Sequence, residues 1–408
     1  MSEILFLAHR VPFPPDRGDK IRSNHLLRRI ASIAPVHVGA LADDAADMAQ
    51  EHELAAIAAS HCLVRRTAPL PLAALAALGQ GVPVSLAAFA SAKLKRWVAH
   101  VLETRPIAAI FVFSGQMAQY VPPAFRGRVV MDFVDVDSAK FEAYAQTGAL
   151  PRRLLYAREA RLLRRFEEAT ARRVTTSLFI TAEERALFES RLEQGALPDV
   201  RALGNGIDTE LFDPAAVNPA PELAGEGPGI VFTGQMDYPP NVTAVELFAH
   251  EVMPRIRDVH PGARFAVVGR APTAAVRALG GLHGTVVTGA VPDVRPWLAG
   301  ADLVTAPLLI ARGVQNKVLE AMAMARPVLL TPAAATGIGA ADGVQFALAE
   351  APAMLAEKAL ALLSDRAAAE SMGAAARRYV IAECGWDRVL APLRTLLQGA
   401  PESLGNAA

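Results

Sequence analysis

The chain has 408 residues, of which 52% are hydrophobic and 20% are charged. That length is sufficient for two domains, and that composition excludes an intrinsically disordered protein. The 41 basic and 41 acidic residues give a formal net charge of zero, so no global electrostatic field argues for nucleic-acid binding.

The first residues and one uncharged segment bear on membrane insertion. Residues 1–10 lack the basic start and the long apolar run of a signal peptide. Residues 67–92 carry no charge, but proline and glycine interrupt them, so we expect two short helices rather than a membrane span. Cys62 and Cys384 have no metal-ligand spacing, and we expect two reduced cysteines in a cytoplasmic protein.

The first half of the chain alternates short β-rich runs with helical patterns. We expect strands over residues 4–8, 36–41, 107–113, 129–134 and 174–177. The helical patterns between them include residues 20–30 and 92–102. Alternation of this kind predicts a parallel sheet with helices on both faces.

The loop after the first strand opens the first helix. Gly18 in this loop permits a close approach of backbone to a ligand. The loop lacks the G-x-G-x-x-G pattern, which weakens a dinucleotide interpretation.

Three aspartates, Asp132, Asp135 and Asp137, lie at the end of the strand expected over residues 129–134. We expect all three to point the same way. Buried charges are costly unless they are paired or used. Asp137 is our candidate for a hydrogen bond to a sugar. A metal cluster is the weaker alternative, because no histidine or further carboxylate completes it.

A helical pattern over residues 151–173 contains eight arginines and three glutamates. One interpretation is a solvated face with ion pairs four residues apart. The alternative is a dock for anionic lipid headgroups or a lipid diphosphate. Six arginines would make that membrane contact: Arg152, Arg153, Arg158, Arg161, Arg164 and Arg165.

The pattern pauses after Asn205-Gly206, a strong turn signal, and we place the linker at residues 218–227. A second alternating set follows, with strands expected over residues 230–233, 265–268, 286–288, 303–306 and 328–331. The predicted architecture is α/β, with two Rossmann-like doubly wound domains over residues 1–217 and 218–383 facing a central cleft. Residues 384–408 are expected to form a C-terminal helix that returns to the first domain, and a tail. Ligands of such sheets bind beyond the carboxyl ends of the strands.

Two turns of the second domain could contact a ligand. The strand over residues 230–233 ends at Gly234, where backbone can approach a ligand, and Asn241 is a plausible N-cap of the next helix. The simpler alternative is a capped strand–helix turn.

The second turn spans Gly313, Val314, Gln315 and Asn316 and opens a short helix. Its backbone N–H groups and the positive helix end could hold a phosphate. One turn later, Glu320 is an acceptor-only side chain suited to sugar hydroxyls. The alternative is an ordinary turn in which Glu320 pairs with Lys317, three residues earlier.

Together these segments resemble the family 4 retaining glycosyltransferases, which have the GT-B fold. The resemblance rests on residues 205–208, Phe212, Pro214, residues 232–234, 267–269, 319–323 and 326–328, and Trp386. A closer resemblance is to the sugar transferases associated with PEP-CTERM/exosortase exopolysaccharide loci. It rests on residues 8–20, 132–137 and 235–241.

The resemblance implies a UDP- or GDP-linked sugar donor on the second domain and a glycan or lipid-linked acceptor on the first. It implies that Glu320 binds the donor ribose, that the turn over residues 313–316 cradles the diphosphate, and that Gly18 lies near the transferred sugar. Further expected donor contacts are Gly234, Gln235, Asn241 and Gly269. The implied enzyme needs neither metal nor cofactor, and a phosphate oxygen of the donor helps to deprotonate the acceptor.

Two departures from the family pattern matter. Arg312 stands where the family often has a glutamate, and no arginine or lysine follows the Gly234 turn. A departing nucleoside diphosphate needs positive charge or oriented donors. We therefore hypothesise that Arg312 or Lys317 supplies that charge. The alternatives are a scaffold protein of a glycan assembly complex with a degenerate donor site, and a nucleotide-sugar epimerase.

Overall fold

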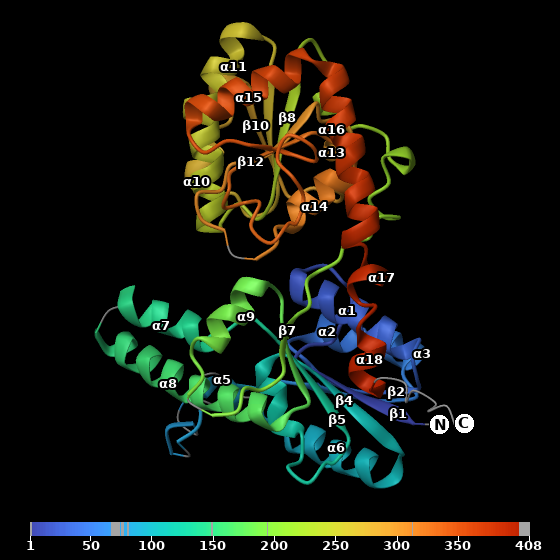
Figure 1. The fold of residues 1–408 in the computed structure, drawn as a ribbon. Coiled ribbons are helices and arrows are strands. Elements are labelled where there is room, and N and C mark those ends of the chain that lie inside the picture. Colours follow the sequence, from blue (N-terminus) through green and yellow to red (C-terminus); the bar gives the residue numbers. More distant parts are fainter. Residues whose placement is uncertain are drawn as a thin grey trace. The chain divides into compact units, whose positions relative to one another are not determined.

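The computed structural model describes residues 2–66, 74, 77–79, 81–147, 150–193, 195–311 and 313–399. Contacts divide the chain into two compact units, whose elements Figure 1 colours by their position in the sequence. The first contains the described residues up to Gly204 together with those from Leu390 onward, and the second is Asn205–Val389.

The first unit is built on a seven-stranded parallel sheet in the order β3-β2-β1-β4-β5-β6-β7. Its strands are β1 (Glu3–Ala8), β2 (Val36–Ala42), β3 (Ser60–Arg65), β4 (Ile107–Phe113), β5 (Arg128–Val134), β6 (Thr176–Phe179) and β7 (Val200–Ala202). Every residue of β1 and β2 is buried, as expected of central strands covered on both faces. The sequence did not predict β3 and β7, which form the two edges.

Helices cover the first sheet. They are α1 (Gly18–Ala31), α2 (Ala45–Ala49), α3 (Glu51–Ile57), α5 (Val84–Ala88), α6 (Ala92–Thr104), α7 (Asp137–Thr147), α8 (Leu150–Arg173) and α9 (Ala182–Glu189), with the 3₁₀ turn η1 (Gly115–Tyr120). Side chains cap several of them: Ser91 accepts from the Leu94 amide before α6, and Thr181 accepts from the Glu184 amide before α9.

The last helix, α18 (Leu393–Gln398), belongs to the first unit. It packs on β4 and β5, and Arg128 Nε donates to the Leu396 carbonyl over 2.7 Å. The predicted return of the C-terminal helix to the first domain is therefore confirmed.

The second unit is built on a six-stranded parallel sheet in the order β10-β9-β8-β11-β12-β13. Its strands are β8 (Gly229–Thr233), β9 (Arg264–Val268), β10 (Thr285–Gly289), β11 (Leu303–Ala306), β12 (Val328–Leu330) and β13 (Ala347–Leu348). Its helices are α10 (Pro239–Leu247), α11 (Met253–Val259), α12 (Ala274–Ala278), α13 (Arg295–Ala299), α14 (Asn316–Ala323), α15 (Pro352–Ser364), α16 (Arg366–Tyr379) and α17 (Trp386–Val389). Two π-helical segments, η4 (Phe248–Val252) and η6 (Val380–Cys384), continue α10 and α16. Three short 3₁₀ turns complete this unit, namely η2 (Pro214–Ala216), η3 (Pro221–Leu223) and η5 (Leu282–Gly284).

Residues that precede the expected linker pack into the second unit. The Ile207 amide donates to the Cys384 carbonyl over 2.8 Å, and the Phe212 carbonyl accepts from Arg377 over 2.9 Å. The contacts therefore divide the chain at residues 204/205 and 389/390, whereas the sequence placed the divisions at 217/218 and 383/384.

The α/β class with two doubly wound parallel sheets agrees with the sequence prediction. No helix within the described ranges is long and apolar enough to cross a membrane. Of the two short helices expected over residues 67–92, α5 is observed, while residues 67–73, 75, 76 and 80 lie outside the described residues.

Candidate functional site

Two glycines meet at the carboxyl ends of β8 and β9. The Gly234 amide donates to the Val268 carbonyl over 3.0 Å, and Gly234 and Gly269 both have positive φ, +158° and +155°. A Cβ atom on Gly269 would lie 1.6 Å from the Gly234 carbonyl oxygen. Glycine at both positions therefore lets the two strand ends approach each other at the edge where ligands of parallel sheets bind.

Asn241 does not cap α10, so the N-cap prediction was wrong. Tyr238 is the N-cap and prolines occupy the first two helical positions, because their fixed φ suits the start of a helix. Asn241 therefore lies in the first turn, where its side chain is buried. Its Nδ2 donates to the Gln235 carbonyl over 2.8 Å, and its Oδ1 accepts from Lys317 Nζ over 2.6 Å.

Lys317 reaches this turn from α14. Its ammonium lies 4.3 Å from the centroid of the Phe232 ring, and a Cβ atom on Gly234 would lie 2.9 Å from it. Burial lowers the pKa of Lys317 to about 8, although the charge of Glu320 opposes the shift. Folding thus brings a cation beside the loop after β8, where the sequence itself has none.

Glu320 lies one turn after Lys317 on the same helix. The two form no ion pair, and no other residue in the described part of the chain hydrogen-bonds the Glu320 carboxylate. Burial raises the pKa of Glu320 to about 7, with Lys317 acting in the opposite direction. This carboxylate is consequently available to accept hydrogen bonds from a ligand.

The turn before α14 has the geometry of an anion-binding helix start. Gly313 has φ +65°, and Gln315, the N-cap residue, donates from Nε2 to the Gly313 carbonyl over 3.1 Å. The first amides of α14 have no acceptor within the helix. Two polar oxygens nearby, Thr233 Oγ1 and Asn316 Oδ1, are buried without a hydrogen-bond partner among the described residues. Arg312 lies outside the described residues.

Arg270 is a second cation that sequence reasoning missed. It follows Gly269 at the end of β9, is exposed, and donates from Nη2 to Gln235 Oε1 over 3.0 Å. The sequence could have indicated Arg270 by its position directly after Gly269, the glycine that ends β9. With Lys317, it places two positive charges around the Gly234–Gly269 contact.

In the first unit, Gly18 opens α1 at the carboxyl edge of the sheet. A Cβ atom there would meet nothing within 4 Å, so the position is open. Arg10 and Arg66, which follow β1 and β3, both donate to Asp43, which follows β2. Burial alone would raise the pKa of Asp43, but Arg10 and Arg66 hold it below the ordinary value.

The three aspartates near β5 do not point the same way, which corrects the expectation. Asp132 is fully buried and accepts from Arg22 Nε over 2.9 Å. Asp135 and Asp137 are partly exposed and accept from Lys140 Nζ over 2.8 and 3.2 Å. Asp132 and Asp135 are separated by three positions and β5 ends at Val134, so strand alternation cannot align them. No group of potential metal ligands occurs in the described part of the chain.

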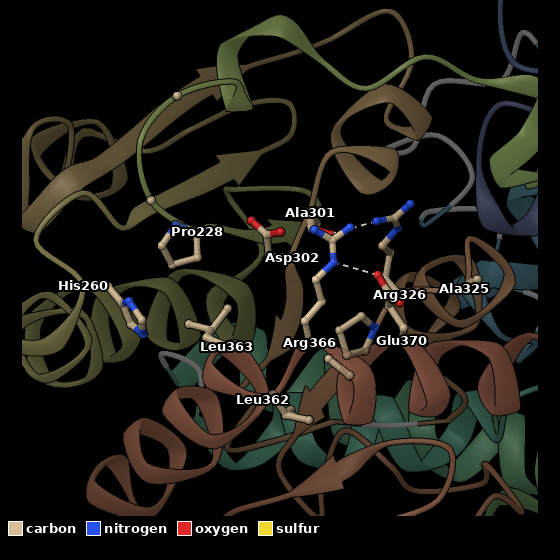
Figure 2. A pocket seen from close by; sticks show the side chains of 14 residues that line it. Pro228, His260, Ala301, Asp302, Ala325, Arg326, Leu362, Leu363, Arg366 and Glu370 are labelled. Carbon is tan, nitrogen blue, oxygen red and sulfur yellow. Dashed lines mark hydrogen bonds and ion pairs between the residues drawn. The ribbon is translucent and has the colours of Figure 1, made fainter.

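A cavity of about 460 Å³ lies elsewhere in the second unit (Figure 2). Its walls include Pro228, Asp302 and Pro327, which precede β8, β11 and β12. It therefore opens at the amino ends of the strands, the edge opposite Gly234 and Gly269. None of the predicted site residues lines it.

Comparison with known proteins relates the second unit to a described protein family. Residues 227–365 match the family model described as glycosyl transferases group 1. The second unit is therefore similar to the glycosyl transferases of group 1. No curated protein sequence matches the chain.

The fold of the whole chain is GT-B, as similar solved structures show. HepE from Anabaena, in complex with UDP and glucose, is 16% identical with a TM-score of 0.66, covering 98% of this chain and 100% of its own. Sucrose-phosphate synthase from Thermosynechococcus elongatus is 14% identical with a TM-score of 0.66, covering 98% of each chain. WaaG, a glycosyltransferase involved in lipopolysaccharide biosynthesis, is 16% identical with a TM-score of 0.62, covering 97% of this chain and 100% of its own. At these identities the likeness establishes the fold.

Proposed function

We propose that this enzyme is a retaining glycosyltransferase that moves a sugar from a UDP- or GDP-linked donor to a glycan or lipid-linked acceptor in exopolysaccharide synthesis. The observation that carries the donor assignment is the placement of Lys317 beside the Gly234 turn, one helical turn before an unpartnered Glu320. Phosphate and ribose could be recognised by these two side chains together. The UDP bound by HepE supports a uridine nucleotide as the first donor to test.

Each part of the donor has a proposed partner in the second unit. Lys317 and the first amides of α14 bind the diphosphate, because a helix N-terminus and a desolvated ammonium both favour anions. The Glu320 carboxylate accepts from the two ribose hydroxyls. Arg270 supplies further positive charge, and the glycines at 234 and 269 leave room for the ligand to approach the backbone.

The proposed chemistry breaks the bond between the sugar C1 and the donor phosphate oxygen and forms a bond from C1 to the acceptor oxygen on the same face. The acceptor proton passes to an oxygen of the departing phosphate. Lys317 stabilises the negative charge that develops on that phosphate. In the first unit, Asp137 hydrogen-bonds the sugar and Gly18 allows its close approach; no metal ion is required in this scheme.

A screen of donor binding tests the proposal. Thermal unfolding is followed with UDP- and GDP-sugars for wild type, Glu320→Ala and the control Glu370→Ala, which alters an exposed glutamate of the same unit. We expect one nucleotide sugar to stabilise wild type and the control, and to stabilise Glu320→Ala much less. Equal stabilisation of all three proteins would exclude the ribose role.

A product assay tests the reaction itself. With the donor found in the screen and an added glycan acceptor, NMR of the product should show the anomeric configuration of the donor. An inverted product would exclude the retaining mechanism. Conversion of the donor to an epimer without acceptor would instead support an epimerase. The same assay on Arg312→Ala and Lys317→Ala distinguishes the two candidate cations.

A further inference from the structure

A helical pair in the first unit has an outer surface that the proposed donor chemistry does not use. Helices α7 and α8 lie side by side along their length, as Figure 1 shows at the edge of the first unit.

The inner face of α8 contains two buried glutamates that cap neighbouring helices. The Glu159 carboxylate accepts from the backbone amides of Val84 and Ser85, at 2.8 Å each, where α5 begins. The Glu167 carboxylate accepts from the Ser138 amide over 2.9 Å and from its hydroxyl over 2.5 Å, in the first turn of α7. Two of the three acidic residues of α8 are therefore directed inward and are occupied there.

The outer face of α8 is a single continuous stripe. Its members are exposed and lie three or four residues apart, except for two adjacent arginines at its end, so they share one side of the helix. They are Leu150, Leu154, Ala157, Arg161, Arg164 and Arg165. We call this set the α8 stripe. Its first half is apolar, with Leu150 75% and Leu154 68% exposed, and its second half is basic.

The charge of the α8 stripe is not balanced along the helix. Within the described residues of α8, the one ion pair of i,i+4 spacing joins Arg172 to Glu168. Arg164 donates to the Arg191 carbonyl, and its charge helps to lower the pKa of Glu142, with which it forms no ion pair. Arg161 and Arg165 are exposed and form no ion pair with a described residue. Of the pairs four residues apart that one interpretation of the sequence expected, the described residues of α8 contain the Arg172–Glu168 pair.

We propose that the α8 stripe binds the surface of an anionic lipid bilayer. Leu150 and Leu154, with the exposed Tyr144 at the end of α7, enter the interfacial layer. Arg161, Arg164 and Arg165 lie over lipid phosphates, which attract basic side chains close to an anionic surface. A bilayer fits better than a second copy of the chain, because two identical basic stripes would repel each other. It fits better than an acidic protein surface, because such a surface offers nothing for the apolar half.

Vesicle flotation tests this surface independently of donor binding. Wild type is mixed with neutral phosphatidylcholine vesicles and with vesicles that contain about one third phosphatidylglycerol. One variant removes the apolar half, Leu150→Ser with Leu154→Ser, and one removes the charge, Arg161→Gln with Arg165→Gln. The controls are Leu197→Ser, a leucine of the same 75% exposure in the same unit, and Arg126→Gln, an exposed arginine away from α8.

We expect wild type and both controls to float with the anionic vesicles and not with the neutral ones. Each α8 variant should lose binding by about tenfold or more. Absence of flotation with anionic vesicles, or flotation of the α8 variants equal to that of the controls, would overturn the proposal. Thermal unfolding and nucleotide affinity of each variant are measured in parallel, so that loss of fold or of the donor site is distinguished from loss of membrane binding.

Discussion

Lys317 Nζ donates a 2.6 Å hydrogen bond to Asn241 Oδ1, which joins two helices of the second unit across 76 positions of sequence. Asn241 also donates to the Gln235 carbonyl. The amide of Asn241 therefore holds the ammonium beside the loop after β8 and fixes that loop at the same time. The two residues are far apart in the sequence and meet only in the folded protein. Substitutions can test what this contact contributes.

Replacing Lys317 by methionine should weaken nucleotide binding. The substitution keeps an apolar chain on the Phe232 ring but removes the charge, and charge-assisted hydrogen bonds contribute about 1.5–3 kcal/mol. We expect the affinity for UDP to fall by about tenfold to a hundredfold in calorimetry. Lys358→Met, an exposed lysine of the same unit, is the control. An unchanged affinity in Lys317→Met would remove this lysine from the diphosphate site.

The pKa of Lys317 predicts a pH dependence of donor binding. Burial lowers this pKa to about 8, so the ammonium loses its proton as the pH rises through that value. Between pH 7 and 9 the affinity for UDP-glucose should fall by about tenfold, since the charged fraction falls by about that factor. Lys317→Arg keeps its charge over this range and should show a flatter profile. A profile that is the same in both proteins would assign the titration to another group.

Glu320 should make the free enzyme less stable as the pH rises. Its folded pKa of about 7 lies above the ordinary value of 4.5. Its contribution to stability is therefore fully present below pH 4.5 and is lost as the pH rises through 7. Glu320→Gln has no such proton to lose, and at pH 8 it should unfold about 6–12 °C above wild type. The two melting temperatures should converge near pH 5; a constant difference would contradict the assignment.

Substitution by alanine should strongly destabilise the protein at Gly269 and should change its stability little at Gly18. Gly269→Ala places a Cβ atom 1.6 Å from the Gly234 carbonyl oxygen, and the strain should cost about 3 kcal/mol or more and disrupt the donor site. Gly18→Ala meets no atom within 4 Å in the first turn of α1, so stability should change by less than about 1 kcal/mol. Chemical denaturation measures both. Reduced sugar transfer by the stable Gly18→Ala protein would support a ligand near that backbone, and unaltered transfer would count against it.

The buried pair of Arg22 and Asp132 should contribute to folding of the first unit. Arg22 Nε donates to Asp132, and its terminal nitrogens donate to the Leu203 and Gly204 carbonyls over 2.7 Å each. Asp132→Asn leaves the guanidinium buried without its counter-charge and should cost about 3 kcal/mol in urea denaturation. A much smaller loss would show that the interactions of Arg22 other than that with Asp132 are sufficient. Asp135→Asn, at a partly exposed carboxylate, serves as the comparison.

Much of the fold could be predicted because its central strands are apolar runs bounded by turn residues. Strands β4 and β11 occur over the expected residues, and Gly234 was recognised from its position at the end of β8. The edge strands β3 and β7 were missed, since β3 mixes polar with apolar residues and β7 has three residues. Periodicity carries little information for such short or mixed segments.

The candidate site was harder to predict because its contacts join distant segments. The sequence showed a missing cation after Gly234, and folding places Lys317 there through Asn241. The N-cap assignment of Asn241 was wrong because two prolines begin the helix earlier. Asp132 looked like its neighbours Asp135 and Asp137 in sequence, but its partner Arg22 lies on α1, and nothing local marks that pairing.

The two inward glutamates of α8 give this helix a mechanical role within its unit. Glu159 holds the start of α5 and Glu167 holds the start of α7, directly after Asp137. Sliding α8 along its axis would break both caps at once, so these hydrogen bonds fix the position of α8 against the starts of α5 and α7. The helix that carries the outer stripe is thereby joined to the start of α7, three residues after the carboxyl end of β5.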